Sequence, residues 1–172
     1  MKINEPCQNC CEIALRLANN FSVIIGRWKW EDQMRESIES YGYGNHLRSF
    51  RAVGLTPPEF ITNPDAGQKI IDASIAAVNE DHAESIILGC TLETGFYLQV
   101  QNEILAQTGS FVPVIDASIG ALKTAEHAAS LKLKSSWKTS KLWGLEPPSE
   151  TEMASFNIFQ TPYEFGNLIV VE

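Results

Sequence analysis

The chain has 172 residues, of which 44% are hydrophobic, and its formal net charge is −8. This length fits one domain with a tail, and acidic residues spread along the chain argue against nucleic acid and anionic membranes as partners. No apolar run approaches the ~20 residues that cross a bilayer, and residues 1–12 lack the apolar centre of a signal peptide. We therefore expect a soluble, cytoplasmic protein whose four cysteines are free thiols.

Helical and strand patterns alternate along residues 5–133. Helices are predicted where apolar residues recur at three- and four-residue spacing, and strands where short apolar, β-branched runs end near a glycine. In chain order, the predicted elements are a helix at 5–20, a strand at 21–26, a helix at 30–42, a strand at 47–54, a loop at 56–63, a helix at 66–81, a strand at 84–89, a helix at 95–109, a strand at 112–117 and a helix at 118–133.

This alternation predicts an α/β fold. The near-continuous apolar strands are typical of a parallel sheet that helices cover on both faces, as in a Rossmann-like three-layer αβα domain with four strands. Residues 134–172 are polar, with prolines and aromatics, and are predicted to form a tail that wraps the domain or a partner. Within this tail we expect a short helix near 149–156, and NLIVV at 167–171 as a last strand or a docking segment.

The segment SIILGCTLETGFY at residues 85–97 places Cys90 and Thr91 at the end of the third predicted strand. Ligands of open α/β sheets bind beyond the carboxyl ends of the strands. The next helix begins a few residues later, and its N-terminus favours an anion and lowers the pKa of a nearby thiol. Cys90 would then act as a nucleophile or a base, although a small cysteine buried in the core fits these residues as well.

Five longer stretches resemble a known family. IILGCTLETGFY, followed by VPVIDASIGALKTAEH, resembles the second half of the aspartate/glutamate/hydantoin racemase family. LANNFSVII, SYGYGNHLRSFRAVGL and KTSKLWGLEPPSETEM resemble segments of its hydantoin-racemase branch in the same order, so the resemblance covers about residues 5–155. The Gly-Cys-Thr element after an apolar strand is its most specific part.

The resemblance implies a cofactor-independent racemase or isomerase that acts on a small hydantoin-like or amino-acid-like molecule. Members of the family have two similar α/β halves, related by a pseudo-two-fold axis, with the active site in the cleft between them. Each half supplies one cysteine: one thiolate removes the Cα proton, and the other thiol delivers a proton to the opposite face. No metal, pyridoxal or nucleotide is implied. The tail favours the hydantoin branch.

The family motif assigns roles to four residues around the strand end. Cys90 matches the catalytic cysteine of the second half, and Thr91 matches the neighbouring hydroxyl that anchors the substrate. Gly89 allows the backbone to approach closely, and Glu93 is a hydrogen-bonding neighbour. These residues are the candidate catalytic and substrate-binding groups that the resemblance implies.

One turn departs from the family pattern. A Thr-rich turn is common after the family's equivalent of the strand FSVII, whereas this chain has Gly26, Arg27 and Trp28 there. Arg27 is a candidate for binding an acidic group of the substrate. Alternatively, Arg27 and Trp28 fill the site and exclude the usual ligand.

The half of the family fold that carries the first cysteine is not in this sequence. Residues 1–20 are then a helix left from that half, residues 21–133 the racemase-type domain, and residues 134–172 the tail. A shortened gene or chain, a divergent protein that kept one domain, and a second chain that supplies the other half are all open explanations. An incomplete cleft exposes apolar surface, so we expect a homo-oligomer. The alternative function is a catalytically inactive racemase-like domain that binds a small molecule or a partner.

The remaining cysteines and the histidines leave further alternatives open. Cys7, Cys10 and Cys11 are spaced i, i+3 and i+4 and share one helix face. Helix packing or incidental exposure is the main interpretation, with catalysis and metal binding as alternatives; no second CxxC pair completes a metal site. A hydrolase pairing of Cys90 with a histidine is also conceivable. The three histidines are His46, His82 and His127.

Overall fold

The computed structural model describes residues 5–156 of the chain. They belong to two units: residues 5–136 lie in the first, and residues 137–156 lie in the second. The second unit contains a 3-10 helix, η4 (Trp143–Leu145), and the helix α7 (Glu150–Ser155). Helix α7 confirms the short helix predicted near 149–156, and the Ser149 side chain caps it. The NLIVV segment at 167–171 lies outside the described residues.

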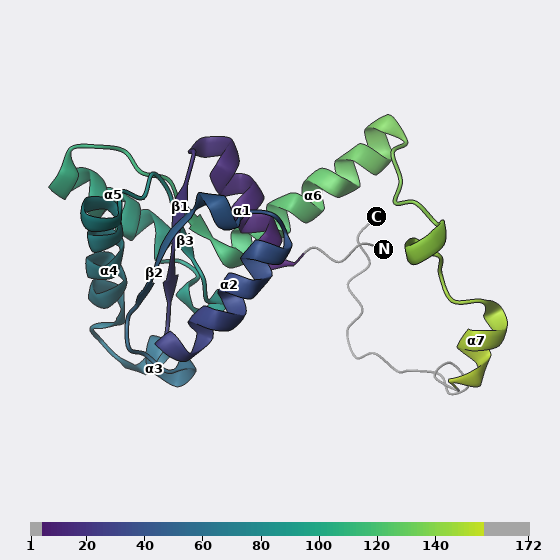
Figure 1. The fold of residues 1–172 in the computed structure, drawn as a ribbon, viewed down its shortest axis with the longest axis horizontal. Helices are drawn as coiled ribbons and strands as arrows, with labels where there is room; N and C mark the ends of the chain where they lie inside the picture. Colours follow the sequence, from purple (N-terminus) through teal and green to yellow (C-terminus); the bar gives the residue numbers. More distant parts are fainter. Residues whose placement is uncertain (1–4, 157–172) are drawn as a thin grey trace. The chain divides into compact units, whose positions relative to one another are not determined.

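The first unit contains four strands, six α-helices and three short 3-10 helices among its described residues (Figure 1). In chain order they are α1 (Pro6–Leu17), β1 (Phe21–Ile25), η1 (Trp28–Trp30), α2 (Glu31–Ser40), η2 (Gly44–His46), β2 (Leu47–Ala52), α3 (Pro57–Thr62), α4 (Ala66–Asp81), β3 (Ile86–Leu88), η3 (Thr91–Glu93), α5 (Tyr97–Thr108), β4 (Val114–Asp116) and α6 (Ala117–Ser135).

The four strands form one parallel sheet in the order β2-β1-β3-β4. Successive residues of a strand face opposite sides of a sheet, and in β1 the side chain of Ile24 joins one core cluster while Val23 and Ile25 join the other. Helices α4 and α5 pack on the first face, and α1 and α2 on the second, as Figure 1 shows. The predicted α/β fold with a four-stranded parallel sheet is therefore confirmed.

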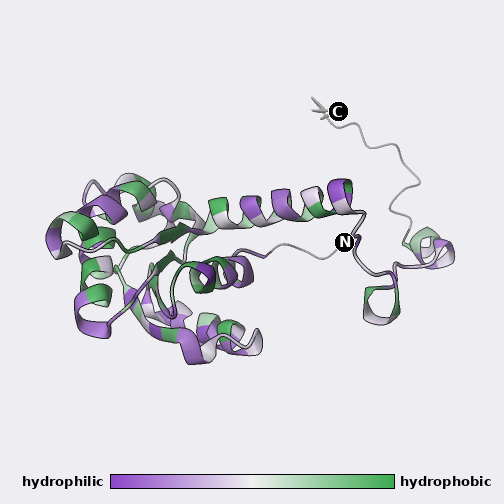
Figure 2. Cartoon of the chain, turned by 90° about the horizontal axis from the view of Figure 1, so that it is seen from above, coloured by the Kyte–Doolittle hydropathy of each residue, from purple (hydrophilic) through white to green (hydrophobic). Residues whose placement is uncertain are grey.

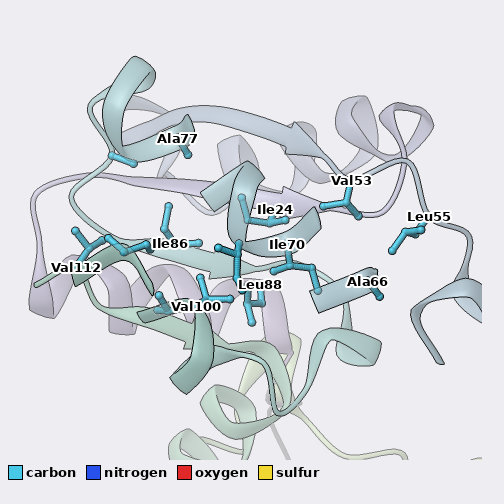
Figure 3. Packing of buried hydrophobic residues seen from close by; sticks show 14 of the residues in the cluster. Ile24, Val53, Leu55, Ala66, Ile70, Ala77, Ile86, Leu88, Val100 and Val112 are labelled. Atoms are coloured by element: carbon cyan, nitrogen blue, oxygen red, sulfur yellow. The ribbon is translucent and has the colours of Figure 1, made fainter. Parts of the chain in front are cut away.

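The core beneath α4 and α5 consists of aliphatic side chains from the central strands and from these helices (Figure 3). Ile24, Ile86 and Leu88 of the strands are 0% exposed, and so are Ile70 of α4 and Val100 of α5. Full burial of one such side chain contributes about 1.5–3 kcal/mol. These contacts fix the positions at which β1 and β3 end.

The loop predicted at residues 56–63 is wrong, because residues 57–62 form the helix α3. Thr56 precedes the helix, and its N–H and Oγ1 both donate to a carboxylate oxygen of Glu59, at 2.7 and 2.6 Å. Proline is well tolerated in a first helical turn, so T-P-P-E is a capping box followed by a helix start. Phe60 of α3 is buried beside the end of β1.

Helix α6 follows β4 directly and is buried only near its start, at Ala117 and Gly120. Its later turns carry hydrophilic and hydrophobic residues in alternation and extend beyond the sheet (Figure 2). Among the described residues, none of the helices has both the length and the apolar character that a membrane span requires.

Candidate functional site

Cys90 lies just beyond the carboxyl end of β3, which is one of the two central strands. The neighbouring central strand, β1, ends at Ile25 and is followed by Gly26. A pocket of about 420 Å³ opens beside these two strand ends and is lined by both Gly89 and Cys90. The structure therefore places Cys90 where ligands bind in open α/β sheets.

Gly89 brings the end of β3 close to β1. A Cβ atom at position 89 would lie 2.7 Å from the carbonyl oxygen of Ile24 and 2.8 Å from Cγ1 of Val23. The Gly89 N–H donates to the same carbonyl oxygen at 2.8 Å. The close backbone approach expected at Gly89 is therefore an approach to the neighbouring strand β1. This contact fixes the position of the backbone just before Cys90.

Most of the pocket wall is apolar. Thr91 is exposed and lines the pocket next to Cys90, as the sequence led us to expect. Apolar and aromatic residues of α2, α3 and the adjoining segments form much of the rest. They are Trp30, Met34, Ile38, Leu55 and Phe60.

Arg27 and Trp28 do not line the pocket that contains Cys90. Arg27 is exposed, and Trp28 is 58% exposed and belongs to a separate shallow pocket on the side of β2. Trp30, which the sequence did not single out, lines the Cys90 pocket instead. Trp30 is the last residue of the 3-10 turn η1 and directly precedes α2, and no spacing in the sequence distinguished it from Trp28.

The thiol of Cys90 is half-buried, and burial raises its pKa above the ordinary value. The backbone N–H of Leu92 acts in the opposite direction, and the nearby carboxyl of Glu93 raises the pKa further. The lowered pKa expected from a helix N-terminus is therefore wrong. The main reason is burial of the thiol; in addition, α5 begins only at Tyr97, and the residues directly after Cys90 form the short turn η3.

Glu93 lies beneath the site rather than in its wall. Its side chain is 0% exposed, and Oε2 accepts a hydrogen bond from the Cys90 backbone N–H at 3.3 Å. Oε1 has no hydrogen-bond partner among the described residues. Burial, with a contribution from the charge of Asp116, raises the pKa of Glu93 to about 8. Glu93 is thus a buried acid that is largely protonated at neutral pH.

Asp116 does not line the Cys90 pocket, but it holds the loop after Cys90, a role that the sequence did not show. One oxygen accepts the N–H groups of Ser118 and Ile119 at 2.9 and 3.0 Å, which caps α6. The other oxygen accepts the Gly95 N–H at 3.0 Å, and the Thr94 hydroxyl lies 3.4 Å from the first. The D-A-S sequence at the start of a predicted helix was the signal. Asp116 ties the loop after Cys90 to the start of α6.

Three further thiols, on α1, line the same pocket. Cys10 and Cys11 are each 1% exposed and pack in the core between α1 and the sheet, while Cys7 is half-buried. A hydrogen bond with Cys11 lowers the pKa of Cys7, and burial raises that of Cys10 to about 12. In the part of the chain that the structure describes, no group of His, Cys, Asp or Glu is arranged to hold a metal ion.

The histidines stay apart from Cys90. The residues that line its pocket include no histidine, and Nδ1 of His46 lies 2.9 Å from the backbone oxygen of Asn19. Nothing in the described residues therefore supports a Cys–His pairing.

The fold and the pocket together define the class of this protein. It is an α/β protein with a parallel sheet, and a cysteine and a threonine line a pocket at the end of a central strand. The sequence model of the Asp/Glu/Hydantoin racemase family matches residues 5–125, and the chain belongs to this family.

Two relatives are similar to the chain over most of its length. A hydantoin racemase of Pseudomonas sp. (strain NS671) is 30% identical over 141 residues, which are 81% of this chain and 53% of the relative. A hydantoin racemase of Paenarthrobacter aurescens is 28% identical over 154 residues, 87% of this chain and 61% of the relative. The chain thus spans less than two thirds of the length of these relatives.

Two solved structures share the fold. The allantoin racemase from Klebsiella pneumoniae superposes with a TM-score of 0.69 at 24% identity, covering 84% of this chain and 56% of the other. The allantoin racemase from Pseudomonas fluorescens gives a TM-score of 0.65 at 26% identity, covering 81% and 60%. The αβα architecture described above is therefore that of racemases of known structure.

Proposed function

We propose that this chain is a cofactor-independent racemase-type protein in which the Cys90 thiolate removes the proton alpha to a carbonyl group. The observation that carries the proposal is the position of Cys90, at the carboxyl end of a central strand and in the wall of a pocket. Membership of the racemase family supports it. In the same proposal, the hydroxyl of Thr91 anchors the substrate.

The chemistry is a proton transfer that creates and then quenches an enolate. The Cα–H bond breaks, the proton goes to Sγ of Cys90, and the electron pair moves into the adjacent carbonyl group. Hydrogen-bond donors at the site stabilise the oxygen as it gains charge. Return of the proton from Cys90 restores the same enantiomer, whereas a proton from an acid on the opposite face gives the mirror image.

The pocket wall favours a substrate without a charged side group. Met34, Ile38 and Phe60 offer apolar surface, and Arg27 lies outside this pocket. An acidic group would lose hydration there without gaining a cationic partner, because no Lys, Arg or His is among the described residues that line this pocket. We therefore propose a hydantoin-like substrate with an apolar substituent ahead of an acidic amino acid, and the names of the two sequence relatives agree with this choice.

Self-association is part of the proposal. Among the described strands, β4 lies at one edge of the sheet, and a groove beside it is lined by Leu17 and Phe111, which are 60% and 64% exposed. Apolar surface of this kind favours an interface between copies of the chain. Sedimentation velocity at micromolar concentration should show a species larger than the monomer, and a monomer alone would contradict this.

A second candidate function is binding of a small molecule without turnover. The observation that favours it is the half-burial of the Cys90 thiol, which raises its pKa and so disfavours the thiolate. In this case the pocket still takes the ligand, but the Cα proton does not exchange.

The test is hydrogen exchange in D₂O. The protein and a Cys90→Ser variant are incubated with single enantiomers of 5-substituted hydantoins and of acidic and apolar amino acids. NMR follows deuterium at Cα, and chiral chromatography follows inversion. We expect exchange that the variant loses. Binding detected by calorimetry without any exchange would replace the racemase proposal with the binding function.

A further inference from the structure

Two buried carboxyl groups lie under the loop that carries Cys90, and the fold treats them differently. Asp116 is 3% exposed, and its two oxygens accept backbone N–H groups from α6 and from Gly95. Glu93 is 0% exposed, with Oε2 on the Cys90 N–H and Oε1 without a partner among the described residues. Backbone N–H groups therefore stabilise a negative charge on Asp116. Glu93 has fewer such donors, so a negative charge on its carboxyl group would be poorly stabilised.

Ionisation of Glu93 is opposed by its surroundings. An ionised carboxylate in an apolar environment is costly unless it is fully paired, and a second carboxylate nearby adds repulsion. Burial is the larger cause and Asp116 a smaller one, and together they raise the pKa of Glu93 to about 8. The backbone N–H groups of Cys90 and Gly89 lower the pKa but do not offset burial. At neutral pH the group is a carboxylic acid that accepts a hydrogen bond from the backbone of Cys90.

The elements packed on η3 bring no free cation to Glu93 among the described residues. They are α3 and α6. In α3 the charged residue is Glu59, whose carboxylate binds Thr56. In α6 the first charged residue is Lys123, which pairs with Glu126 at 2.8 Å. Asp116, at the start of α6, and the Cys90 thiol complete the titratable groups that face Glu93.

We propose that Glu93 is a positioning residue for Cys90: its neutral carboxyl holds the Cys90 amide and keeps negative charge away from the thiol, and its ionisation suppresses the thiolate. Two groups that each repel the other's charge titrate as a coupled pair. When Glu93 loses its proton, formation of a thiolate at Cys90 becomes harder. The reactivity of Cys90 therefore rises less steeply with pH than that of an isolated thiol.

This inference deepens the proposed function, and it rests on that function only for its catalytic consequence. A thiolate that becomes harder to form as the pH rises would limit proton abstraction on the alkaline side. The protonation of Cys90 itself can be followed without any substrate. Failure of the exchange experiment would therefore leave the inference about Glu93 standing, and failure of the inference would leave the exchange experiment valid.

The test is the pH dependence of Cys90 alkylation by iodoacetamide. Trypsin releases residues 70–123 as one peptide, and Cys90 is its only cysteine, so mass spectrometry separates it from the thiols of α1. Glu93→Gln keeps the size and an acceptor oxygen but cannot ionise. We expect wild type and variant to react equally at pH 6.5, and the variant to react ~3- to 10-fold faster above pH 9, a shift of up to one pKa unit.

Two controls make the result decisive. Glu59→Gln is the first control. Glu59 is exposed and accepts a hydrogen bond from the Thr56 N–H, just as Glu93 accepts one from the Cys90 N–H. This variant should leave the pH dependence of Cys90 alkylation unchanged. Glu93→Met, which cannot ionise either, replaces Glu93→Gln if circular dichroism shows that the latter does not fold, and should reproduce the faster reaction. Equal profiles for wild type and variant would overturn the proposal. So would a change by the same factor at every pH, because a purely structural role of Glu93 predicts that.

Discussion

The thiols of α1 and the thiol after β3 line the same pocket, yet the fold holds them in different ways. Cys10 and Cys11 are 1% exposed and fill space between a helix and the sheet. Cys90 is half-buried on a loop whose backbone is tied to Glu93. The comparison teaches that lining the pocket does not by itself make a thiol accessible to a ligand. The element that carries the thiol decides how deeply the thiol is buried. Helix α1 buries Cys10 and Cys11 in the core, whereas the end of β3 leaves Cys90 half-buried at the pocket.

The largest expected effect is a pH dependence of the unfolding free energy, caused by Glu93 under the Cys90 loop. The pKa of Glu93 is raised to about 8, so the folded protein binds a proton there that the unfolded chain releases above its ordinary pKa near 4.5. Stability should therefore fall as the pH rises from about 5 to 8, by on the order of a few kcal/mol. Urea unfolding of wild type and Glu93→Gln checks this: the variant should lack the fall, and parallel curves would contradict it.

Removal of Asp116 should loosen the Cys90 loop and leave the packing of α1 in place. Asp116→Ala removes a helix cap and leaves the Gly95 N–H without its acceptor, at a cost of about 2–4 kcal/mol. Hydrogen exchange read by mass spectrometry should show faster exchange at residues 91–96 and little change in α1. Uniform acceleration across both regions would mean that Asp116 supports the whole fold.

Gly89→Ala tests whether the strand end must lie close to β1. The new Cβ would lie 2.7 Å from the Ile24 carbonyl oxygen, a backbone atom that cannot move cheaply. We expect a loss of about 1–3 kcal/mol in unfolding free energy, together with a change in Cys90 alkylation. Gly144→Ala is the matched control, since nothing lies within 4 Å of its Cβ position. Equal thermal stability of the two variants would show that β3 can shift.

The smallest effect should come from the thiols on α1. Cys10→Ala removes a buried sulfur that packs against Gly120, and should cost about 1–2 kcal/mol by chemical denaturation. The rate at which iodoacetamide labels Cys90 should not change, because Cys10 supports the helix rather than the loop. A clear change in that rate would erase the distinction between the two groups of thiols.

The sequence was sufficient to predict the features that depend on local pattern. Apolar runs at 21–26 and 84–89 predicted the two central strands, and Cys90 at a strand end followed from the second. The loop predicted at 56–63 missed helix α3, although T-P-P-E at 56–59 carries a capping box. That error was one of interpretation, since the signal was local.

Features that depend on tertiary contacts could not be predicted in the same way. The burial of Glu93 comes from packing of α3 and α6 on η3, and its raised pKa needs Asp116 from a different strand. The place of Trp30 in the pocket, with Arg27 outside it, depends on how one 3-10 turn is oriented. No spacing within the sequence encodes such contacts, because they join segments far apart in the chain.

The most direct test of the central claim compares two single variants, Cys90→Ser and Cys7→Ser, in the D₂O exchange of a 5-alkyl hydantoin. Both residues are half-buried thiols in the wall of the same pocket. Loss of a general base lowers the rate by roughly 10²–10⁴-fold. The account predicts that loss for Cys90→Ser and a rate within about threefold of wild type for Cys7→Ser. Exchange that survives Cys90→Ser, or that Cys7→Ser removes instead, would contradict it.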